Sequence, residues 1–224
     1  HAAEPFFLYV PHPIPHRPLH VSPSSLERVP EDIKQALAKE TDSIDYKTRD
    51  RLFPQAIAEI DDSVGRIVDA LAEHGIDSHT LVLFTSDNGP AIGSAGPLRG
   101  RKGSAFEGGM REPTVAWWPG TIPSGSVCDE LRPAMDLLPT FAKLAGAALP
   151  DDRVIDGRDI FAVLTRPGTP SPHERFFYHQ GNRLRAVRSG PWKLYVGPQR
   201  DRPAAGPALY HPGEDPRAPP HPLR

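Results

Sequence analysis

The chain of 224 residues has one cysteine, two methionines and a formal net charge of only −2. A single cysteine excludes an internal disulfide framework and a cysteine-rich zinc site. No apolar run approaches the roughly 20 residues that a membrane-spanning helix needs. The small net charge creates no field that would gather nucleic acid or an anionic membrane. With 38% hydrophobic residues and 19 glycines, the composition is that of a globular protein.

Proline is abundant overall but scarce in the middle of the chain, where Pro54 is the only one between residues 31 and 89. Because proline lacks the donor that helices need, the long helices are expected in this window. The spacing predicts a helix from Pro54 to His74, ended by Gly75. Its apolar stripe consists of Ile57, Ile60, Val64, Ile67, Val68 and Leu71.

Short apolar runs predict buried strands at residues 5–10, 80–85 and 114–118, and a second helix is predicted over 135–144. Strands that alternate with helices through short links indicate an α/β fold with a largely parallel sheet.

The pattern changes after about residue 150. Residues 175–179, 184–188 and 192–196 alternate apolar and polar side chains between glycine-containing turns, which predicts a small antiparallel sheet. We therefore expect a main α/β domain over 1–150, a small antiparallel subdomain over 151–197 and a Pro/Arg-rich irregular tail over 198–224.

Asp87 and Asn88 follow the predicted strand 80–85, at an end where open α/β sheets gather ligands. Their carboxylate and amide oxygens suit Ca²⁺ or Mg²⁺ rather than zinc. The alternative is that Asp-Asn-Gly forms an ordinary tight turn.

Two other residues have a possible chemical role. His16 lies in a loop stiffened by four prolines, so its imidazole is held at low entropic cost for work on an anion or a proton. Lys102 lies between Gly100 and Gly103, where a cation can approach an oxyanion closely. The alternatives are a solvated loop histidine and a solvated basic turn.

Three further features favour structural explanations. The charges of residues 106–113 precede a buried strand and are typical of scaffold, with a tight backbone approach at the glycine pair. Asp61 and Asp62 are adjacent on a helix and do not face each other. Cys128 has no activating base nearby in the sequence.

Taken together and in this order, the segments resemble the sulfatase family, in its arylsulfatase A and N-acetylgalactosamine-6-sulfatase branch. The resemblance covers residues 5–196 and rests on five segments: PFFLYVPHPIPHRPL, AEIDDSVGRIVDALAEHGIDSHTLVLFTSDNGP, GPLRGRKGSAFEGGMREPTVAWWPG, DLLPTFAKLAGAALPDDRVIDGRDI and FFYHQGNRLRAVRSGPWKLY.

The resemblance implies an alkaline-phosphatase-like mixed sheet flanked by helices, followed by a small antiparallel C-terminal sheet. It implies that Asp87 and Asn88 bind Ca²⁺ or Mg²⁺, that Lys102 contacts the sulfate and its bridging oxygen, and that His16 serves the leaving-group oxygen. The substrates would be aryl or carbohydrate sulfate esters. Family members are usually periplasmic, secreted or lysosomal.

The nucleophile motif, the paired metal-binding aspartates and the lysine–histidine segment of the family are missing. Sulfatases convert the Cys or Ser of a C/S-x-P-x-R motif to a formylglycine nucleophile, but here Cys128 is followed by Asp-Glu-Leu-Arg. With His1 in place of Met, this predicts the C-terminal part of a sulfatase, inactive alone. The alternatives are a non-catalytic metal- or anion-binding sulfatase-like protein, and a phosphate or phosphonate monoesterase of the same superfamily.

Overall fold

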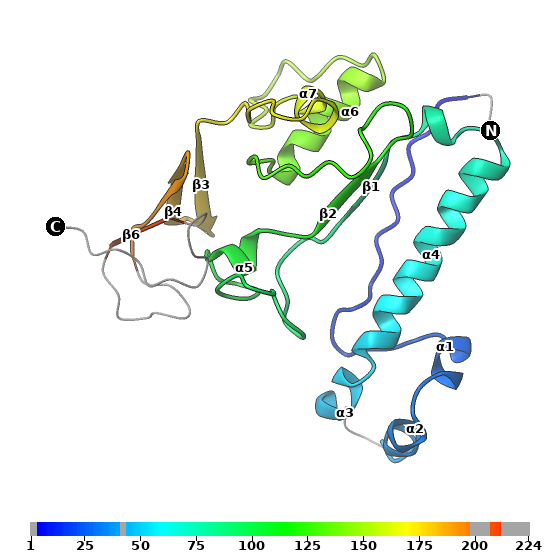
Figure 1. Cartoon of the computed structure of the whole chain (residues 1–224). Coiled ribbons are helices and arrows are strands. Elements are labelled where there is room, and N and C mark those ends of the chain that lie inside the picture. Colours follow the sequence, from blue (N-terminus) through cyan, green and yellow to red (C-terminus); the bar gives the residue numbers. More distant parts are fainter. Residues whose placement is uncertain (1–3, 41–43, 198–206, 212–224) are drawn as a thin grey trace. The chain divides into compact units, whose positions relative to one another are not determined.

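The computed structural model describes residues 4–40, 44–197 and 207–211. The chain divides into two compact units, residues 1–80 and 81–224 (Figure 1). Within the described residues, no helix is both long enough and apolar enough to span a bilayer.

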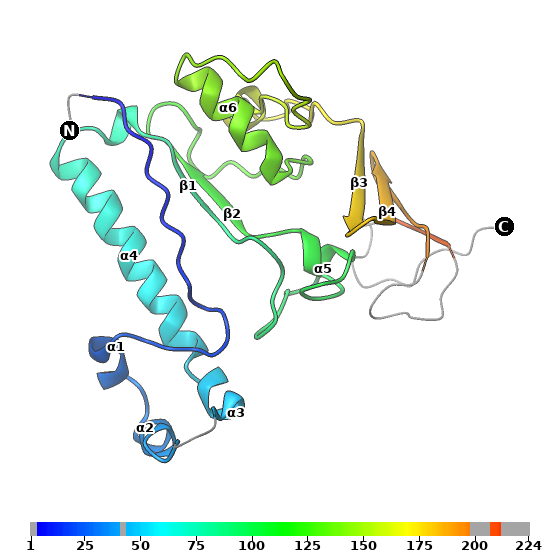
Figure 2. The ribbon, with the colours of Figure 1, turned by 180° about the vertical axis from the view of Figure 1, so that it is seen from behind.

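The first unit is helical. Its elements are α1 (Pro23–Glu27), α2 (Glu31–Leu37), α3 (Tyr46–Asp50), α4 (Phe53–Glu73) and the 3₁₀ helix η1 (Asp77–His79). Figure 2 shows α1, α2 and α3 gathered near the N-terminal end of the long helix α4.

Helix α4 confirms the helix predicted from the apolar stripe. Proline lies in its first turn, where the missing N–H costs nothing. Ile60 and Leu71 are buried, whereas Ile57 is 42% exposed. The stripe therefore packs only in part within the described residues of this unit.

The strand predicted over residues 5–10 is wrong for this structure. The segment is extended but belongs to no sheet, and Phe7 and Tyr9 are each 75% exposed. A strand needs a neighbouring strand for its backbone groups, and none of the described residues supplies one.

The second unit begins with a two-stranded sheet of β1 (Val82–Thr85) and β2 (Thr114–Trp117). The strands lie close to the predicted positions, but they pair antiparallel rather than parallel, with Val82 opposite Trp117. A parallel pair needs a crossover connection, usually a helix. The connection here contains only the four-residue helix α5 (Glu107–Met110) and turns the chain back.

Next come the 3₁₀ helix η2 (Ala134–Asp136), α6 (Leu137–Leu144) and α7 (Phe161–Thr165). The second predicted helix is thus confirmed, with its first residues wound as a 3₁₀ turn.

The C-terminal sheet is antiparallel, in the order β3 (Arg175–Gln180), β4 (Arg183–Ser189), β5 (Trp192–Tyr195) and β6 (Ala208–Tyr210). The three predicted strands are confirmed. Strand β6 was missed, because it lies inside the segment expected to be an irregular tail. The ring of Tyr210 packs at 6.3 Å from that of Tyr195, which anchors this short strand in the core. The rest of that tail, 198–206 and 212–224, lies outside the described residues.

Candidate active site

Strand β1 presents Asp87 and Asn88 just beyond its last residue. The ladder closes at Thr85, whose hydroxyl lies 2.9 Å from that of Thr114 on β2. The Ser86 hydroxyl then donates to the Asn88 carbonyl at 3.1 Å, which tightens the turn. Asp87 is exposed and Asn88 is half-buried. The carboxylate therefore reaches solvent from a turn whose backbone is fixed.

The Lys102 loop is closed by its own hydrogen bonds. The Ser104 hydroxyl accepts from Arg101 N at 3.2 Å and donates to Arg101 O at 2.9 Å. Gly100 and Gly103 have φ of 87° and 83°, which L side chains rarely adopt. These hydrogen bonds and glycine conformations define the shape of the loop.

Close contacts between glycines bring the Asp87–Asn88 turn and the Lys102 loop together. A Cβ on Gly89 would lie 2.1 Å from Gly108 O, and one on Gly109 would lie 2.5 Å from Arg101 O. Gly89 N donates to Gly109 O at 3.4 Å, and Lys102 N donates to Pro90 O at 3.3 Å. We call these contacts of Gly89, Gly108 and Gly109 the glycine contact.

Glu112 is a further acidic residue beside the turn. Counting on from the β1–β2 register, it comes opposite Asp87. Its Oε1 is buried without a hydrogen-bond partner. Burial, and to a lesser extent the negative charge of Asp87, raises the pKa of Glu112 to about 7. Sequence reasoning assigned this glutamate to the scaffold, because its neighbours in the chain give no sign that it faces Asp87.

His16 lies in the first unit, whereas the other three predicted residues lie in the second. Its imidazole is exposed, and Nδ1 lies 2.7 Å from the Arg17 carbonyl. A carbonyl only accepts, so Nδ1 carries a proton and Nε2 is the nitrogen left for a ligand.

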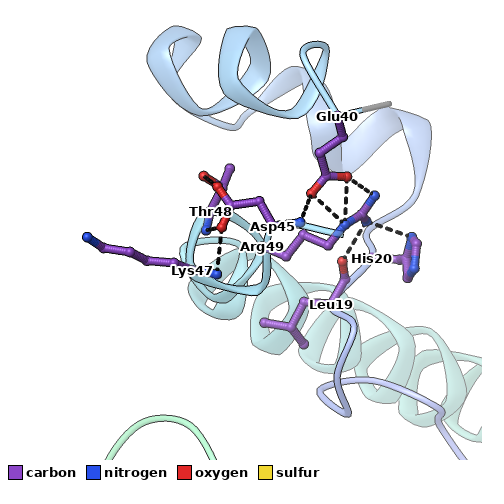
Figure 3. A network of polar contacts seen from close by, with 7 residues as sticks. All are labelled: Leu19, His20, Glu40, Asp45, Lys47, Thr48 and Arg49. Atoms are coloured by element: carbon purple, nitrogen blue, oxygen red, sulfur yellow. Dashed lines mark hydrogen bonds and ion pairs between the residues drawn. The ribbon is translucent and has the colours of Figure 1, made fainter. Parts of the chain in front are cut away.

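Ion pairs and hydrogen bonds anchor the residues that follow His16 in the sequence. Arg17 pairs with Asp50 of α3. Arg49 pairs with Glu40 and donates to the Leu19 carbonyl at 3.1 Å, while Nδ1 of His20 lies 3.1 Å from its guanidinium (Figure 3). The segment that follows His16 is therefore tied to the residues around α3.

A pocket of about 320 Å³ in the same unit is lined by His12 rather than His16. Its lining also includes His20, Glu59 and Arg66. The pocket is thus separate from the histidine that the sequence favoured.

The sequence can be assigned to a protein family by its match to a family model. The family model for sulfatases matches residues 1–147, and these include all four predicted site residues. The chain belongs to the sulfatase family.

The sequences of individual sulfatases are also similar to that of this chain. The chain is 44% identical over 151 residues to N-acetylgalactosamine-6-sulfatase of Mus musculus, covering 64% of this chain and 29% of that protein. It is 36% identical over 206 residues to an arylsulfatase of Hemicentrotus pulcherrimus, covering 89% and 34%. This sulfatase chain thus spans about a third of the length of these relatives.

The fold is also that of sulfatases, which is alkaline-phosphatase-like. The crystal structure of the PsFucS1 sulfatase from Pseudoalteromonas sp. matches with a TM-score of 0.65 and 30% identity. The match covers 73% of this chain and 36% of that one. The predicted fold class is confirmed.

The side chains at the Asp87–Asn88 turn of this sulfatase carry the oxygen donors that a hard divalent cation prefers. Asp87 and Asn88 offer oxygen donors, and the unpartnered Oε1 of Glu112 is a further oxygen beside the turn. Ca²⁺ takes six to eight oxygens. Within the described residues, no group of three or more His, Cys, Asp or Glu is arranged to hold a metal ion. A complete coordination sphere therefore needs ligands beyond these.

Sequence reasoning missed a buried ion pair between α5 and β5. Lys193 Nζ donates to Glu107 Oε1 at 2.7 Å, and the two side chains are 0% and 1% exposed. One signal was available: Lys193 alternates with Tyr195 on β5 and so shares its inward face.

Proposed function

We propose that this chain forms the cation- and sulfate-binding part of the active site of a sulfuric ester hydrolase. Asp87 and Asn88 would be two ligands of the divalent cation, and Lys102 would contact the sulfate and the ester oxygen. The observation that carries the proposal is the glycine contact, which holds the Lys102 loop against the Asp87–Asn88 turn.

The charges of these groups suit the reaction. Cleavage of a sulfate ester builds negative charge on the peripheral oxygens and on the departing oxygen. A bound Ca²⁺ or Mg²⁺ would supply Lewis-acid stabilisation of such oxygens. Lys102 would add a second positive charge beside these oxygens.

His16 would act on the leaving-group oxygen. Because Nδ1 is engaged with the Arg17 carbonyl, Nε2 is the atom assigned to that oxygen. A protonated imidazole can donate from Nε2 and then pass its proton to the departing alkoxide or phenoxide oxygen, which leaves as the alcohol or phenol.

The nucleophile would come from a segment that this sequence does not contain. The sequence has no C/S-x-P-x-R motif, from which the formylglycine of sulfatases is made. The chain also matches only about a third of each relative. We therefore propose that the 224 residues alone do not turn over sulfate esters.

The proposed substrates are aryl or carbohydrate sulfate esters. The names of the relatives, an N-acetylgalactosamine-6-sulfatase and an arylsulfatase, span both classes. The net charge of only −2 does not favour a nucleic-acid partner.

The test is to compare p-nitrophenyl sulfate and p-nitrophenyl phosphate as substrates of the complete protein that carries this chain. We expect sulfate hydrolysis that is abolished by a chelator and restored by Ca²⁺ or Mg²⁺. We expect none from the 224 residues alone. Faster hydrolysis of the phosphate would instead support a phosphate or phosphonate monoesterase.

A second candidate is a non-catalytic module that binds a divalent cation and an anion. The absent nucleophile motif favours it. Calorimetry of the 224-residue chain with CaCl₂ and with sodium sulfate separates the two candidates. Saturable binding by a chain whose complete protein hydrolyses no sulfate ester would support the non-catalytic module.

A further inference from the structure

Helix α5 connects the Lys102 loop to the C-terminal sheet. On one side, Gly108 N donates to Arg99 O at 2.6 Å, and Gly109 packs on the Arg101 carbonyl. On the other side, the Glu107 carboxylate accepts a hydrogen bond from Lys193 of β5. Four residues of helix thus carry both contacts.

The Lys193 side chain is fully buried among the residues that the structure describes. Its ammonium lies 3.6 Å from the ring centre of Tyr178 and 5.6 Å from that of Tyr195. The other charged groups that act on it are Arg188 and Arg111, and both are repulsive. Glu107 is therefore the carboxylate that neutralises this buried cation.

A buried ion pair of this kind is weak evidence for a large contribution to the free energy of unfolding. Removing two charges from water is unfavourable, and replacing such a pair with apolar residues of similar volume often leaves a protein as stable or makes it more stable. The geometry here is directional, with one Nζ–Oε1 bond of 2.7 Å and the ammonium stacked on an aromatic ring. The pair therefore links α5 to β5 through one defined contact.

We infer that Lys193 is a positioning residue, which holds Lys102 at the sulfate-binding position through Glu107 and the glycine contact. The path runs from Nζ to the Glu107 carboxylate, along α5 to Gly108 and Gly109, and across to the backbone of Arg99 and Arg101. The inference rests on the proposed function only for the role of Lys102. The coupling between Lys193 and the loop stands on the geometry alone.

The test compares Lys193→Met, Lys193→Arg and Glu107→Gln by hydrogen–deuterium exchange of the full chain. We expect amides of residues 99–110 to exchange about tenfold faster in Lys193→Met and Glu107→Gln. Exchange over α6, in the same unit, should stay unchanged. Lys143→Met is the matched control, since it removes a lysine that is 66% exposed and paired with Asp159.

Binding of inorganic sulfate supplies a readout that overall stability would not move. The Kd for sulfate should rise about tenfold in Lys193→Met. Lys193→Arg should rescue binding only in part, because arginine keeps the charge but is larger than the buried lysine it replaces. A positioning role predicts this rescue, because arginine keeps the charge that pairs with Glu107.

The outcomes separate the two claims. Unchanged exchange over 99–110, or an equal rise over the whole second unit, would overturn the positioning role. If Lys193→Met does not fold, Glu107→Gln, which keeps the shape of the side chain, decides in the same way. A Lys102→Ala variant that binds sulfate normally would instead remove the proposed function and leave the coupling in place.

Discussion

His173 Nε2 lies 2.7 Å from Asp136 Oδ1, and the two side chains are only 6% and 0% exposed. Asp136 also accepts from Arg158 N at 2.9 Å, and its own carbonyl accepts from the Thr140 hydroxyl. One buried carboxylate thus joins the start of α6 to the segments before α7 and before β3.

Replacing Asp136 with alanine should lower the free energy of unfolding by about 3 kcal/mol, because it leaves buried donors without a partner. Urea denaturation measures the change. The control is Asp129→Ala, whose carboxylate is 84% exposed and should matter by less than about 0.5 kcal/mol. Equal effects of the two substitutions would show that the Asp136 cluster is not a structural centre.

Gly89→Ala tests the glycine contact. The new Cβ would meet the Gly108 carbonyl at 2.1 Å, where only backbone can move aside. We expect a loss of about 3 kcal/mol in stability and weaker binding of inorganic sulfate.

The control for that substitution is Gly65→Ala in α4, where nothing lies within 4 Å of the new Cβ. It should stabilise the chain by about 1 kcal/mol, as expected for glycine inside a helix. If Gly89→Ala behaved like Gly65→Ala, the two loops would not be in contact.

The buried Lys193 predicts a specific dependence of stability on pH. Burial lowers its pKa from 10.5 to about 8, although Glu107 opposes the shift. Between these values the folded chain holds fewer protons at this site than the unfolded chain, so the free energy of unfolding rises with pH.

We expect wild type to gain about 2 kcal/mol relative to Lys193→Met between about pH 7.5 and about pH 10. Urea titrations of both chains at the two pH values measure it, and the comparison cancels groups that lie away from Lys193 and are unaffected by the substitution. A difference that does not change with pH would mean that the Lys193 pKa is not lowered.

The exposed segment before His16 should bind a hydrophobic dye. Phe7 and Tyr9 are each 75% exposed, and their segment belongs to no sheet of the described residues. Replacing both with serine should reduce dye fluorescence and change stability by less than about 0.5 kcal/mol.

Phe106→Ser is the matched contrast, because that ring is 2% exposed and packs at 4.8 Å from Tyr195. It should cost about 3 kcal/mol or more. A large loss of stability from the serine pair at Phe7 and Tyr9 would show that the segment is packed in solution.

Local patterns were sufficient to predict the elements whose cause is local. Helix α4 follows from its apolar spacing, and β3, β4 and β5 follow from alternation between glycine turns. The strand predicted over 5–10 shows the limit. Its composition suits a buried strand, but pairing depends on residues far away in the chain or outside it.

The candidate site divides in the same way. Asp87, Asn88 and Lys102 were identifiable because glycines and a strand end frame them in the sequence. Glu112 and Lys193 were not, since each gains its significance from a residue that only the fold brings near. The opposition of Glu112 to Asp87 depends on an antiparallel register, whereas the sequence suggested parallel strands.

The central claim is that Lys102 binds the sulfate group of a sulfatase substrate. Its most direct test is kcat/KM for p-nitrophenyl sulfate in the complete protein that carries this chain, with Lys102→Ala compared against Lys143→Ala. We predict a loss of about 10²–10³-fold for Lys102→Ala, typical of removing a charge that stabilises the transition state, and a change within about twofold for Lys143→Ala. Equal activity of the two variants would contradict the account.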